Sequence, residues 1–485
     1  MRALPSLSGI FSITSAVHDD GLYMALQTLD RQTSRARAGA ARAVPPATPS
    51  MVDPRIVLAG IGAGLVMVVG LWWMDTPPLL HGMGDWLTNA GRITGLIAGY
   101  VIVVQLLLMA RVPILERSIG ADRLARWHAI GGRYTVNVVV AHALLITWGY
   151  AVAAHTDPVH QGVTLLRSYP DVLMATVATL MLVGVGVASA RAARRKLRYE
   201  TWYAIHFYTY IAVALAFSHQ FATGADFMHN LEARVLWGSM YATVAALLLW
   251  FRFLAPVRVY LRHRMRVDAV VPEGPGVFSV YIRGAHLDEL GTMPGQFFRW
   301  RFLDRRGWWQ SHPYSLSAPA RADVLRITVK ALGDHTAEIA QLRPGTRVWA
   351  EGPYGAFTAH RSSRPNVLLV AGGIGITPIR TLFETIRPRG HLRLIYRVMT
   401  HEDAVLLDEL QTIAAHRRAR LDLVVGDHRD KPDAMSSARL SALVPKLRNY
   451  DVYLCGPPGF VTAVRHALLG AGVTPGAIHT EEFAF

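Results

Sequence analysis

Residues 127–151 read WHAIGGRYTVNVVVAHALLITWGYA, and residues 200–221 read ETWYAIHFYTYIAVALAFSHQF. Each segment is apolar and long enough to cross a bilayer as a helix. The first carries His128 and His142, and the second carries His206 and His219. At about 1.5 Å of rise per residue, the two histidines of each segment lie roughly 20 Å apart along the helix axis. A hydrocarbon core is about 30 Å thick, so each helix has one histidine near either side of the membrane.

These histidines indicate a pair of haem sites. Two helices with histidines at matching depths can hold two haems across the bilayer, with one axial imidazole from each helix. A lone histidine in a membrane helix has another explanation, a packed polar side chain that bonds to a neighbouring helix. Two depth-matched pairs favour ligation, because ionisable groups inside a membrane are costly and usually functional. We therefore predict two b-type haems, with His128, His206, His142 and His219 as metal ligands.

The spacing within the second segment leaves a geometric question open. The fourteen residues from His128 to His142 return a helix to nearly the same face, whereas the thirteen from His206 to His219 do not. The second helix must therefore kink, bulge, or present its two histidines to differently oriented rings.

The chain contains several apolar runs of roughly membrane-spanning length. They cover about 56–74, 90–110, 127–151, 170–190, 200–221 and 234–253. Only 17% of the residues are charged, whereas a soluble protein carries about a quarter. We predict a six-helix transmembrane haem-binding bundle, so membrane lipid is an expected partner.

The distribution of charge predicts the orientation of this bundle. Basic residues gather in the loops 111–126 and 191–198 and after the last run, whereas acidic residues such as Asp75 and Asp226 occur in the other loops. By the positive-inside rule, both termini are cytoplasmic, and the first histidine of each helix lies on the cytoplasmic side. The net charge of +16 would also suit a nucleic-acid binder. Its clustering beside apolar runs is a topology signal, so we expect a multi-pass plasma-membrane protein with no nucleic-acid partner.

After Arg266 the pattern becomes that of a soluble protein. Short alternating segments at 267–272, 277–283, 296–303 and 324–331 predict an antiparallel β-barrel. From residue 366 onward, apolar strands alternate with helical stretches, which predicts a parallel α/β sheet. The expected parts are a disordered basic cytoplasmic tail (1–50), the transmembrane domain (51–262), the barrel domain (263–365) and an α/β nucleotide-binding domain (366–485).

Local motifs gather in this soluble half. They are His312-Pro313-Tyr314-Ser315-Leu316-Ser317, Gly333 to Thr336, Gly352 to Gly355, Gly372-Gly373-Ile374-Gly375-Ile376-Thr377-Pro378, Cys455-Gly456-Pro457 and the last residue, Phe485. The glycines of 372–375 let backbone N–H groups approach a phosphate at a helix N-terminus. Thr377 is a candidate cap for that helix, and Pro378 suits its first position.

In this order, the motifs resemble those of the ferredoxin–NADP reductase superfamily. With the histidine pairs in front, the whole arrangement resembles the NADPH oxidase and ferric reductase family over about residues 56–485. The resemblance implies that FAD binds the barrel domain, that Tyr314 stacks on the flavin ring and that Ser315 bonds near its reactive edge. His312 stands where many soluble relatives have arginine, which fits the membrane branch of the family. The residues implied for FAD are His312, Pro313, Tyr314, Ser315, Ser317, Gly333 and Thr336.

The resemblance also implies a nicotinamide site in the α/β domain. The residues expected at the dinucleotide phosphates are Gly372, Gly373, Gly375 and Thr377, and those beside the nicotinamide are Cys455, Gly456 and Pro457. Phe485 matches the terminal aromatic residue that covers the flavin in the family. The implied catalytic residues are Tyr314, Ser315, Cys455 and Phe485. Taken alone, Cys455 would be better explained as a buried small hydrophobe.

Arg397 bears on the choice of nicotinamide. NAD-specific sites often place an acid at the end of the second strand, whereas an arginine there accommodates the 2′-phosphate of NADP. Arg397 follows the predicted strand 392–396, so we expect NADPH as the donor, with NADH possible. A solvated arginine is the rival interpretation.

The resemblance implies an NAD(P)H-dependent transmembrane flavocytochrome b reductase. Electrons would pass from cytoplasmic NAD(P)H through FAD and two haems to an extracytoplasmic small molecule, a ferric chelate or oxygen. In oxygen-reducing relatives, an arginine near the outer end of the second helix and a histidine beyond the outer ligand help bind oxygen. This chain has Arg92 at the first position and Ile146 at the second. Arg92 equally fits a cofactor-binding role beside a haem propionate.

Other functions stay open at this stage. The chain could deliver electrons to a partner protein, act as a non-catalytic haem-binding membrane subunit or sensor, or be a flavin reductase that helices merely tether. The flavin and nicotinamide motifs argue against a sensor, which has no need of hydride chemistry.

Overall fold

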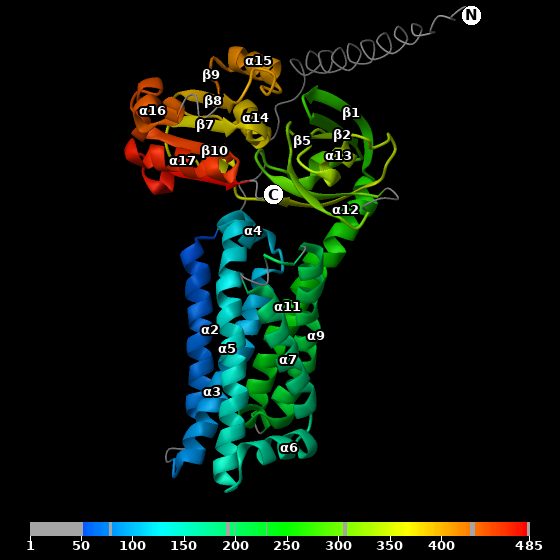
Figure 1. Cartoon of the computed structure of the whole chain (residues 1–485), viewed down its shortest axis with the longest axis vertical. Helices are drawn as coiled ribbons and strands as arrows, with labels where there is room; N and C mark the ends of the chain where they lie inside the picture. The colour runs from blue at the N-terminus through cyan, green and yellow to red at the C-terminus, as the bar shows by residue number, and fades with distance from the viewer. Residues whose placement is uncertain are drawn as a thin grey trace, which may run out of the picture.

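A computed structural model describes residues 52–76, 80–190, 195–197, 199–228, 230–303, 308–426 and 432–482. The predicted tail at 1–50 and the predicted catalytic residue Phe485 lie outside these residues. The described chain forms a long helical bundle with two β-containing domains at one end (Figure 1).

Long apolar helices make up the bundle. They are α2 (Pro54–Met74), α3 (Met83–Leu108), α5 (Ala121–Ala153), α7 (Val172–Ser189), α9 (Tyr199–Thr223) and α11 (Leu231–Leu248), with the shorter α4 (Pro113–Ile119), α6 (Pro158–Ser168) and α10 (Ala225–Met228) between them. Local capping signals mark several of the starts. Asp53 accepts a hydrogen bond from the backbone N–H of Arg55 at the start of α2, and Asn230 does the same for Ala233 in α11.

Within the described residues, five helices are long and apolar enough to cross a membrane. They run Pro54–Met74, Met83–Leu108, Arg123–Ala153, Val172–Ser189 and Leu231–His263. Helix α9 has 25 residues, but it is less apolar because it carries His206, His219 and Gln220. The prediction of a helical membrane region is therefore confirmed for five spans, and α9 as a sixth span stays a prediction.

The surface of the bundle suits a lipid environment. Val66, Trp73 and Leu144 are 73%, 72% and 63% exposed. Helices in lipid associate through close packing of small residues, and α3 packs on α5 in this way. A Cβ atom added at Gly91 would lie 2.8 Å from Cδ1 of Ile146, so the two backbones approach closely at that point.

Helix α11 continues into the soluble half. A π-helical turn at Leu249–Leu254 leads into α12 (Ala255–His263). Arg264 then adopts a left-handed conformation, with φ of 46°, and ends the helix just before the first strand. A continuous helical segment thus connects the membrane bundle to the barrel-like domain (Figure 1).

The predicted barrel is present as two antiparallel three-stranded sheets. Their strand orders are β1-β2-β5 and β4-β3-β6. The strands are β1 (Arg266–Gly274), β2 (Val277–Arg283), β3 (Phe297–Phe302), β4 (His312–Ser315), β5 (Val324–Lys330) and β6 (Val348–Tyr354). Both sheets contribute to one core, in which Val280 and Ile327 of one sheet meet Trp300 and Val348 of the other. The sequence pattern misses β4 and β6, because each contains a proline that reads as a turn signal.

The C-terminal domain is the predicted parallel α/β sheet, with strand order β11-β10-β7-β8-β9. Its strands are β7 (Asn366–Gly372), β8 (Leu392–Val398), β9 (Arg420–Val425), β10 (Tyr450–Gly456) and β11 (Ile478–Glu482), and its helices include α14 (Ile376–Thr385), α15 (Leu407–Arg417), α16 (Ser437–Leu443) and α17 (Pro458–Gly470). The strand order reverses between β7 and β10. Ligands of open α/β sheets bind beyond the carboxyl ends of the strands at such a switch point.

Candidate functional site

The four predicted metal ligands meet as two pairs, one from α5 and one from α9 in each. The ring centroids of His128 and His206 lie 5.8 Å apart with an interplanar angle of 77°. Those of His142 and His219 lie 6.4 Å apart with an angle of 46°. Because α9 is continuous over Tyr199–Thr223, it accommodates the thirteen-residue spacing by presenting differently oriented rings.

The separation of the rings leaves room for a metal between them. Metal–imidazole bonds are about 2 Å long, so two such bonds fit between rings whose centroids are 5.8 and 6.4 Å apart. In the described part of the chain, no group of three or more His, Cys, Asp or Glu side chains is placed to hold a metal alone. A haem needs only axial ligands from the protein, so paired histidines suit a haem.

Hydrogen bonds orient the His142–His219 pair. The Nδ1 atom of His142 lies 2.8 Å from the carbonyl oxygen of Gly91, and that of His219 lies 2.6 Å from the carbonyl oxygen of Ala216. Since a carbonyl can only accept, Nδ1 carries the proton in both rings, and Nε2 is left as a metal ligand. Gly95 makes room for the first ring, because a Cβ atom there would lie 2.7 Å from its Cε1.

The His128–His206 pair is held differently. The ring of His206 stacks on Trp202 at 5.2 Å, and its buried Nδ1 has no hydrogen-bond partner among the described residues. In the amide orientation that satisfies both of its ends, Gln105 donates to Nδ1 of His128 over 2.8 Å. In that orientation Nδ1 of His128 accepts, whereas ligation of a metal through Nε2 goes with a protonated Nδ1. Protein hydrogen bonds therefore favour the ligand tautomer in the His142–His219 pair only.

Arg92, in the N-terminal half of α3, belongs to an ion-pair cluster. Its guanidinium lies 2.7 Å from a carboxylate oxygen of Asp75 and 2.6 Å from one of Asp226. Asn89 accepts a further hydrogen bond from it over 3.3 Å. The predicted cofactor-binding arginine is thus neutralised by two carboxylates of the chain.

The candidate flavin site lies on β4. The rings of His312 and Tyr314 stack at 6.1 Å, and the Trp300 indole N–H donates to the Tyr314 carbonyl oxygen over 3.0 Å. Burial raises the pKa of the Tyr314 phenol, so the ring stays neutral. The Ser315 hydroxyl is buried with no hydrogen-bond partner in the described chain. A bound group can therefore form a hydrogen bond with this hydroxyl without breaking an existing one.

The other residues predicted for FAD fall into two groups. Ser317 is fully buried, and its hydroxyl accepts hydrogen bonds from Thr328 over 2.7 Å and from Arg326 over 3.1 Å. Gly333 lies on the surface just before α13 (Asp334–Ile339), where the Thr336 hydroxyl accepts from its backbone N–H over 3.0 Å. Pro313 is exposed on β4. Ser317 is thus part of the core network rather than of an open surface.

The glycine-rich turn occupies the switch point of the α/β sheet. Gly373 has φ of +52°, a conformation that favours glycine. A Cβ atom at Gly372 would lie 2.6 Å from the Phe460 ring, and one at Gly375 would lie 2.4 Å from the Cys455 carbonyl oxygen. Glycines therefore allow the ends of β7 and β10 to meet closely.

The expectation that Thr377 caps α14 is wrong. A 3₁₀ turn at Gly373–Gly375 precedes the helix, so α14 begins at Ile376 and Thr377 is already its second residue. Pro378, expected at the first position of the helix, is its third residue. The Thr377 hydroxyl instead donates back to the Ile374 carbonyl oxygen over 3.2 Å. Gly375 occupies the cap position without a side-chain hydrogen bond.

Cys455 ends β10 beside this turn, and its side chain is fully buried in the core. Burial, with a smaller contribution from Glu481, raises the pKa of the thiol. A neutral buried thiol fits the alternative of a small hydrophobic core residue. Gly456 closes the strand, and Pro457 precedes α17 as its cap residue.

Arg397 lies near the carboxyl end of β8, as predicted. Its Nη1 donates to the carbonyl oxygens of Val398 and Val424 over 3.0 and 3.4 Å. These carbonyls belong to the ends of β8 and β9, so the guanidinium is placed at the sheet edge where a dinucleotide binds.

Two buried ion-pair clusters are not predicted from the sequence. Arg111, after α3, lies 2.7 Å from a Glu351 carboxylate oxygen and donates to the Tyr354 hydroxyl over 2.8 Å. Both partners belong to β6. Arg326 of β5 pairs with Glu409 of α15 over 2.6 Å. Each cluster joins two domains, and the residues are up to 240 positions apart, so no local pattern reveals them.

Known protein families match all three structural parts. The model described as ferric reductase like transmembrane component matches residues 94–217, the FAD-binding domain model matches 276–358, and the oxidoreductase NAD-binding domain model matches 369–466. The chain therefore combines a ferric reductase transmembrane component with an FAD- and NAD-binding module. This order of domains makes the chain similar to NAD(P)H-dependent flavin oxidoreductases that carry a ferric reductase transmembrane component.

Individual relatives match the soluble half of the chain. The toluate 1,2-dioxygenase electron transfer component of Pseudomonas putida is 31% identical over 215 residues, which cover 42% of this chain and 63% of that protein. An NADPH oxidoreductase of Mycobacterium tuberculosis is 28% identical over 231 residues, 46% of this chain and 60% of that protein. The chain thus spans less than two thirds of either relative. A ferredoxin NADP+ reductase structure from Neisseria gonorrhoeae aligns with 46% of this chain and 98% of its own, at 19% identity and a TM-score of 0.40.

Proposed function

We propose that the chain takes electrons from cytoplasmic NAD(P)H and delivers them across the plasma membrane to an extracytoplasmic acceptor, with FAD and two b-type haems as its redox groups. The observation that supports this proposal most directly is that α5 and α9 bring four histidines together as two facing pairs. The pairs lie roughly 20 Å apart along the helices. This arrangement supports one haem near each membrane surface.

The proposed roles of the protein residues follow from their surroundings. His128 and His206 would hold the inner haem, and His142 and His219 the outer one. The chemistry that the bound groups supply is hydride acceptance by flavin and one-electron transfer by haem. The protein contributes orientation, through the Nδ1 hydrogen bonds of the outer ligands, and a low-polarity environment that tunes potential.

The topology that we propose has six spans and cytoplasmic termini. Helix α9 runs alongside the other long helices of the bundle (Figure 1), which supports its role as the sixth span. The soluble domains lie at the end of the bundle next to α4 (Figure 1). Helix α4 belongs to the loop 111–126, which is rich in arginine. The positive-inside rule favours the cytoplasm for that end. The proposed domain boundaries are 51–262, 263–365 and 366–485, following the tail at 1–50.

At the cytoplasmic end, we assign the flavin to β4 and the nicotinamide to the switch point. The unpartnered Ser315 hydroxyl and the neutral Tyr314 ring support the flavin assignment. The closely packed ends of β7 and β10 support the nicotinamide assignment. The position of Arg397 at the carboxyl end of β8 favours NADPH over NADH.

A ferric chelate is the acceptor that we favour over oxygen. Ile146, at the position where oxygen-reducing relatives have histidine, packs against Gly91. Arg92 is engaged by Asp75 and Asp226 and so offers little net positive charge to an anionic oxygen species. Two histidine ligands also leave no open iron position, so the acceptor would be reduced by outer-sphere transfer.

Delivery of electrons to a partner protein is the second candidate. The relative from Pseudomonas putida is named an electron transfer component, and a 30% identical relative from Mycolicibacterium smegmatis is named a ferredoxin reductase component of a monooxygenase. These names favour a partner for the module, although both relatives match only the soluble half of this chain.

Membrane vesicles of known orientation test the proposal. NADPH supplied to the cytoplasmic face should reduce a b-type cytochrome spectrum and then ferric chelate on the opposite face, with little superoxide. Without a partner protein, absence of chelate and oxygen reduction despite reduced haem would support the second candidate. Absence of any haem spectrum after haem supplementation would contradict the haem proposal.

His142→Leu is the matching variant. It should lower the haem content of the purified protein to about half of the wild-type content while flavin reduction by NADPH persists. His160→Leu is the control, because His160 is exposed on α6. An unchanged haem content in His142→Leu would contradict the ligand assignment.

A further inference from the structure

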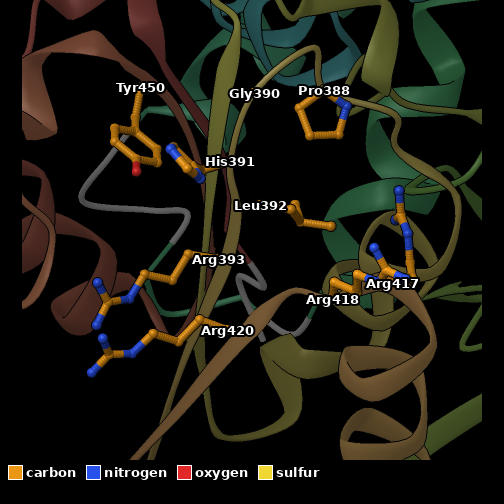
Figure 2. Close-up of a pocket in the computed structure, with 9 residues that line it drawn as sticks. All are labelled: Pro388, Gly390, His391, Leu392, Arg393, Arg417, Arg418, Arg420 and Tyr450. Atoms are coloured by element: carbon orange, nitrogen blue, oxygen red, sulfur yellow. The ribbon is translucent and has the colours of Figure 1, made fainter.

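A basic pocket lies at the edge of the NAD-binding sheet opposite to the glycine-rich turn. It has a volume of about 300 Å³ and is formed where β8, β9 and β10 begin (Figure 2). The side chains that matter here are His391, Arg393, Arg417, Arg418, Arg420 and Tyr450. Strands of seven residues span roughly 20 Å, so the pocket is separate from the proposed nicotinamide site at the carboxyl ends.

Positive charge is concentrated around this pocket. Arg393 and Arg420 share one carboxylate, that of Asp422, over 2.6 and 3.1 Å. Arg417 donates to the backbone carbonyls of Phe383 and Ile386, and its side chain forms no ion pair with any described residue. Burial and the nearby Arg387 lower the pKa of Arg417. The chain therefore holds like charges close together here, an arrangement that a bound anion would relieve.

Two polar groups of the pocket have unused hydrogen-bonding capacity. Arg393 is 6% exposed, and its Nη2 has no partner among the described residues. Tyr450 is 7% exposed, and its hydroxyl makes no hydrogen bond within the described chain. Figure 2 shows Tyr450 beside His391, Arg393 beside Arg420, and Arg417 with Arg418 at the other side of the pocket. Buried donors are normally paired, so the Arg393 Nη2 atom points to a missing acceptor, and the Tyr450 hydroxyl can donate to the same group.

We propose that this pocket is a second anion site that binds a small phosphate-bearing compound, either a free diphosphate or the phosphate tail of a nucleotide. Guanidinium groups present forked donors that match phosphate oxygens, and a tyrosine hydroxyl adds a further donor. The volume of about 300 Å³ lies at the lower end for small-molecule sites. The site is distinct from the nicotinamide site and does not depend on the haem proposal.

Calorimetric titration of the full-length protein in detergent tests this assignment. The protein is first saturated with NADP+, so that the nicotinamide site is filled, and inorganic pyrophosphate or ATP is then added in separate experiments. Arg418→Gln combined with Arg420→Gln should raise the Kd at least about tenfold, since each charge-assisted hydrogen bond contributes appreciably. Both arginines are exposed at the pocket rim, so the fold should be retained. Tyr450→Phe should weaken binding by a smaller factor.

Arg439→Gln is the matched control, because Arg439 is an exposed arginine of α16 outside the pocket. Its Kd should equal the wild-type value, and all variants should retain FAD and its reduction by NADPH. Pyrophosphate binding that the double variant weakens identifies a diphosphate site, and binding of ATP alone identifies a nucleotide site. Absence of binding under NADP+ saturation, or an unchanged Kd in the double variant, would overturn the proposal.

Discussion

At the scale of one residue, the buried hydroxyl of Ser315 allows cofactor binding to be tested without a change in the stability of the protein. It has no partner in the described chain, so Ser315→Ala removes no protein hydrogen bond and should leave the melting temperature nearly unchanged. If the hydroxyl bonds to the flavin, the rate of flavin reduction by NADPH should fall by about 10- to 100-fold. Stopped-flow absorbance of the flavin measures this rate.

Ser317→Ala is the control for that experiment. Its hydroxyl accepts from Thr328 and Arg326, so its loss leaves buried donors unpaired and should destabilise the protein by about 1–3 kcal/mol. Flavin reduction should change less than in Ser315→Ala. If Ser315→Ala and Ser317→Ala changed the melting temperature and the rate of flavin reduction to the same extent, neither hydroxyl would be in contact with the flavin.

The predicted preference for NADPH over NADH depends on Arg397. Arg397→Gln should raise the KM for NADPH by about tenfold or more, since a charged contact to the 2′-phosphate is lost, and should leave the KM for NADH unchanged. Steady-state rates with both nucleotides measure the difference. An equal rise for both would mean that Arg397 acts through the Val398 and Val424 carbonyls, as a structural residue.

At the scale of elements, the ion pair at the end of α3 couples the bundle to β6. Arg111 contacts Glu351 and Tyr354, and both side chains of the ion pair are nearly buried. Arg111→Gln should loosen this contact, so that reduction of the outer acceptor slows while NADPH-driven flavin reduction persists. Hydrogen exchange of the β6 amides should increase. Arg283→Gln, which removes an exposed pair with Asp268 inside the FAD domain, should alter neither.

The sequence predicts those elements whose signal is local. Runs of apolar residues locate the long helices, and the alternation after residue 366 locates β7, β8, β9 and β10. Histidine spacing predicts that the rings of α5 and α9 pair at two depths, and the facing rings are present. The position of Thr377 is misjudged because a 3₁₀ turn displaces the helix start, which residue preferences do not encode.

Contacts between elements cannot be read in this way. The Arg111 cluster joins residues 240 positions apart, and the arginine itself reads only as a topology signal in a basic loop. The pocket around Arg393 likewise forms because parallel strands start at a common edge, which brings together three separate stretches of sequence. Such sites become visible only once strand order is known.

At the scale of the whole molecule, a buried cluster joins the two soluble domains. Glu409 of α15 accepts from Arg326 of β5 over 2.6 Å and from Arg380 of α14 over 2.8 Å. Burial alone would raise the pKa of Glu409, but the hydrogen bonds and charge of Arg326, followed by those of Arg380, lower it to about 2. Domain docking therefore depends on an ionised carboxylate at this interface.

The pH dependence of stability tests whether domain docking needs the ionised Glu409 carboxylate. Because the pKa of Glu409 is lower in the folded protein than in the unfolded chain, its contribution is complete above the ordinary glutamate pKa of about 4.3. The contribution is lost as the pH falls from there towards about 2. Glu409→Gln should lower the melting temperature at pH 7 by several degrees, since it leaves the buried Arg326 without its carboxylate partner and leaves Arg380 paired with Glu384 alone. Flavin release on heating reports this transition.

The difference in melting temperature between wild type and Glu409→Gln should shrink as the pH falls from about 4.3 towards about 2. In this range the unfolded wild-type chain takes up a proton at Glu409, while the folded carboxylate stays ionised until the pH approaches its own pKa. Glu289→Gln is the control: its pair with Arg262 is about half exposed, and exposed pairs contribute little. A difference that stays constant over this pH range would mean that Glu409 acts through its shape and not its charge. The two soluble domains would then be held together by packing rather than by this ion pair.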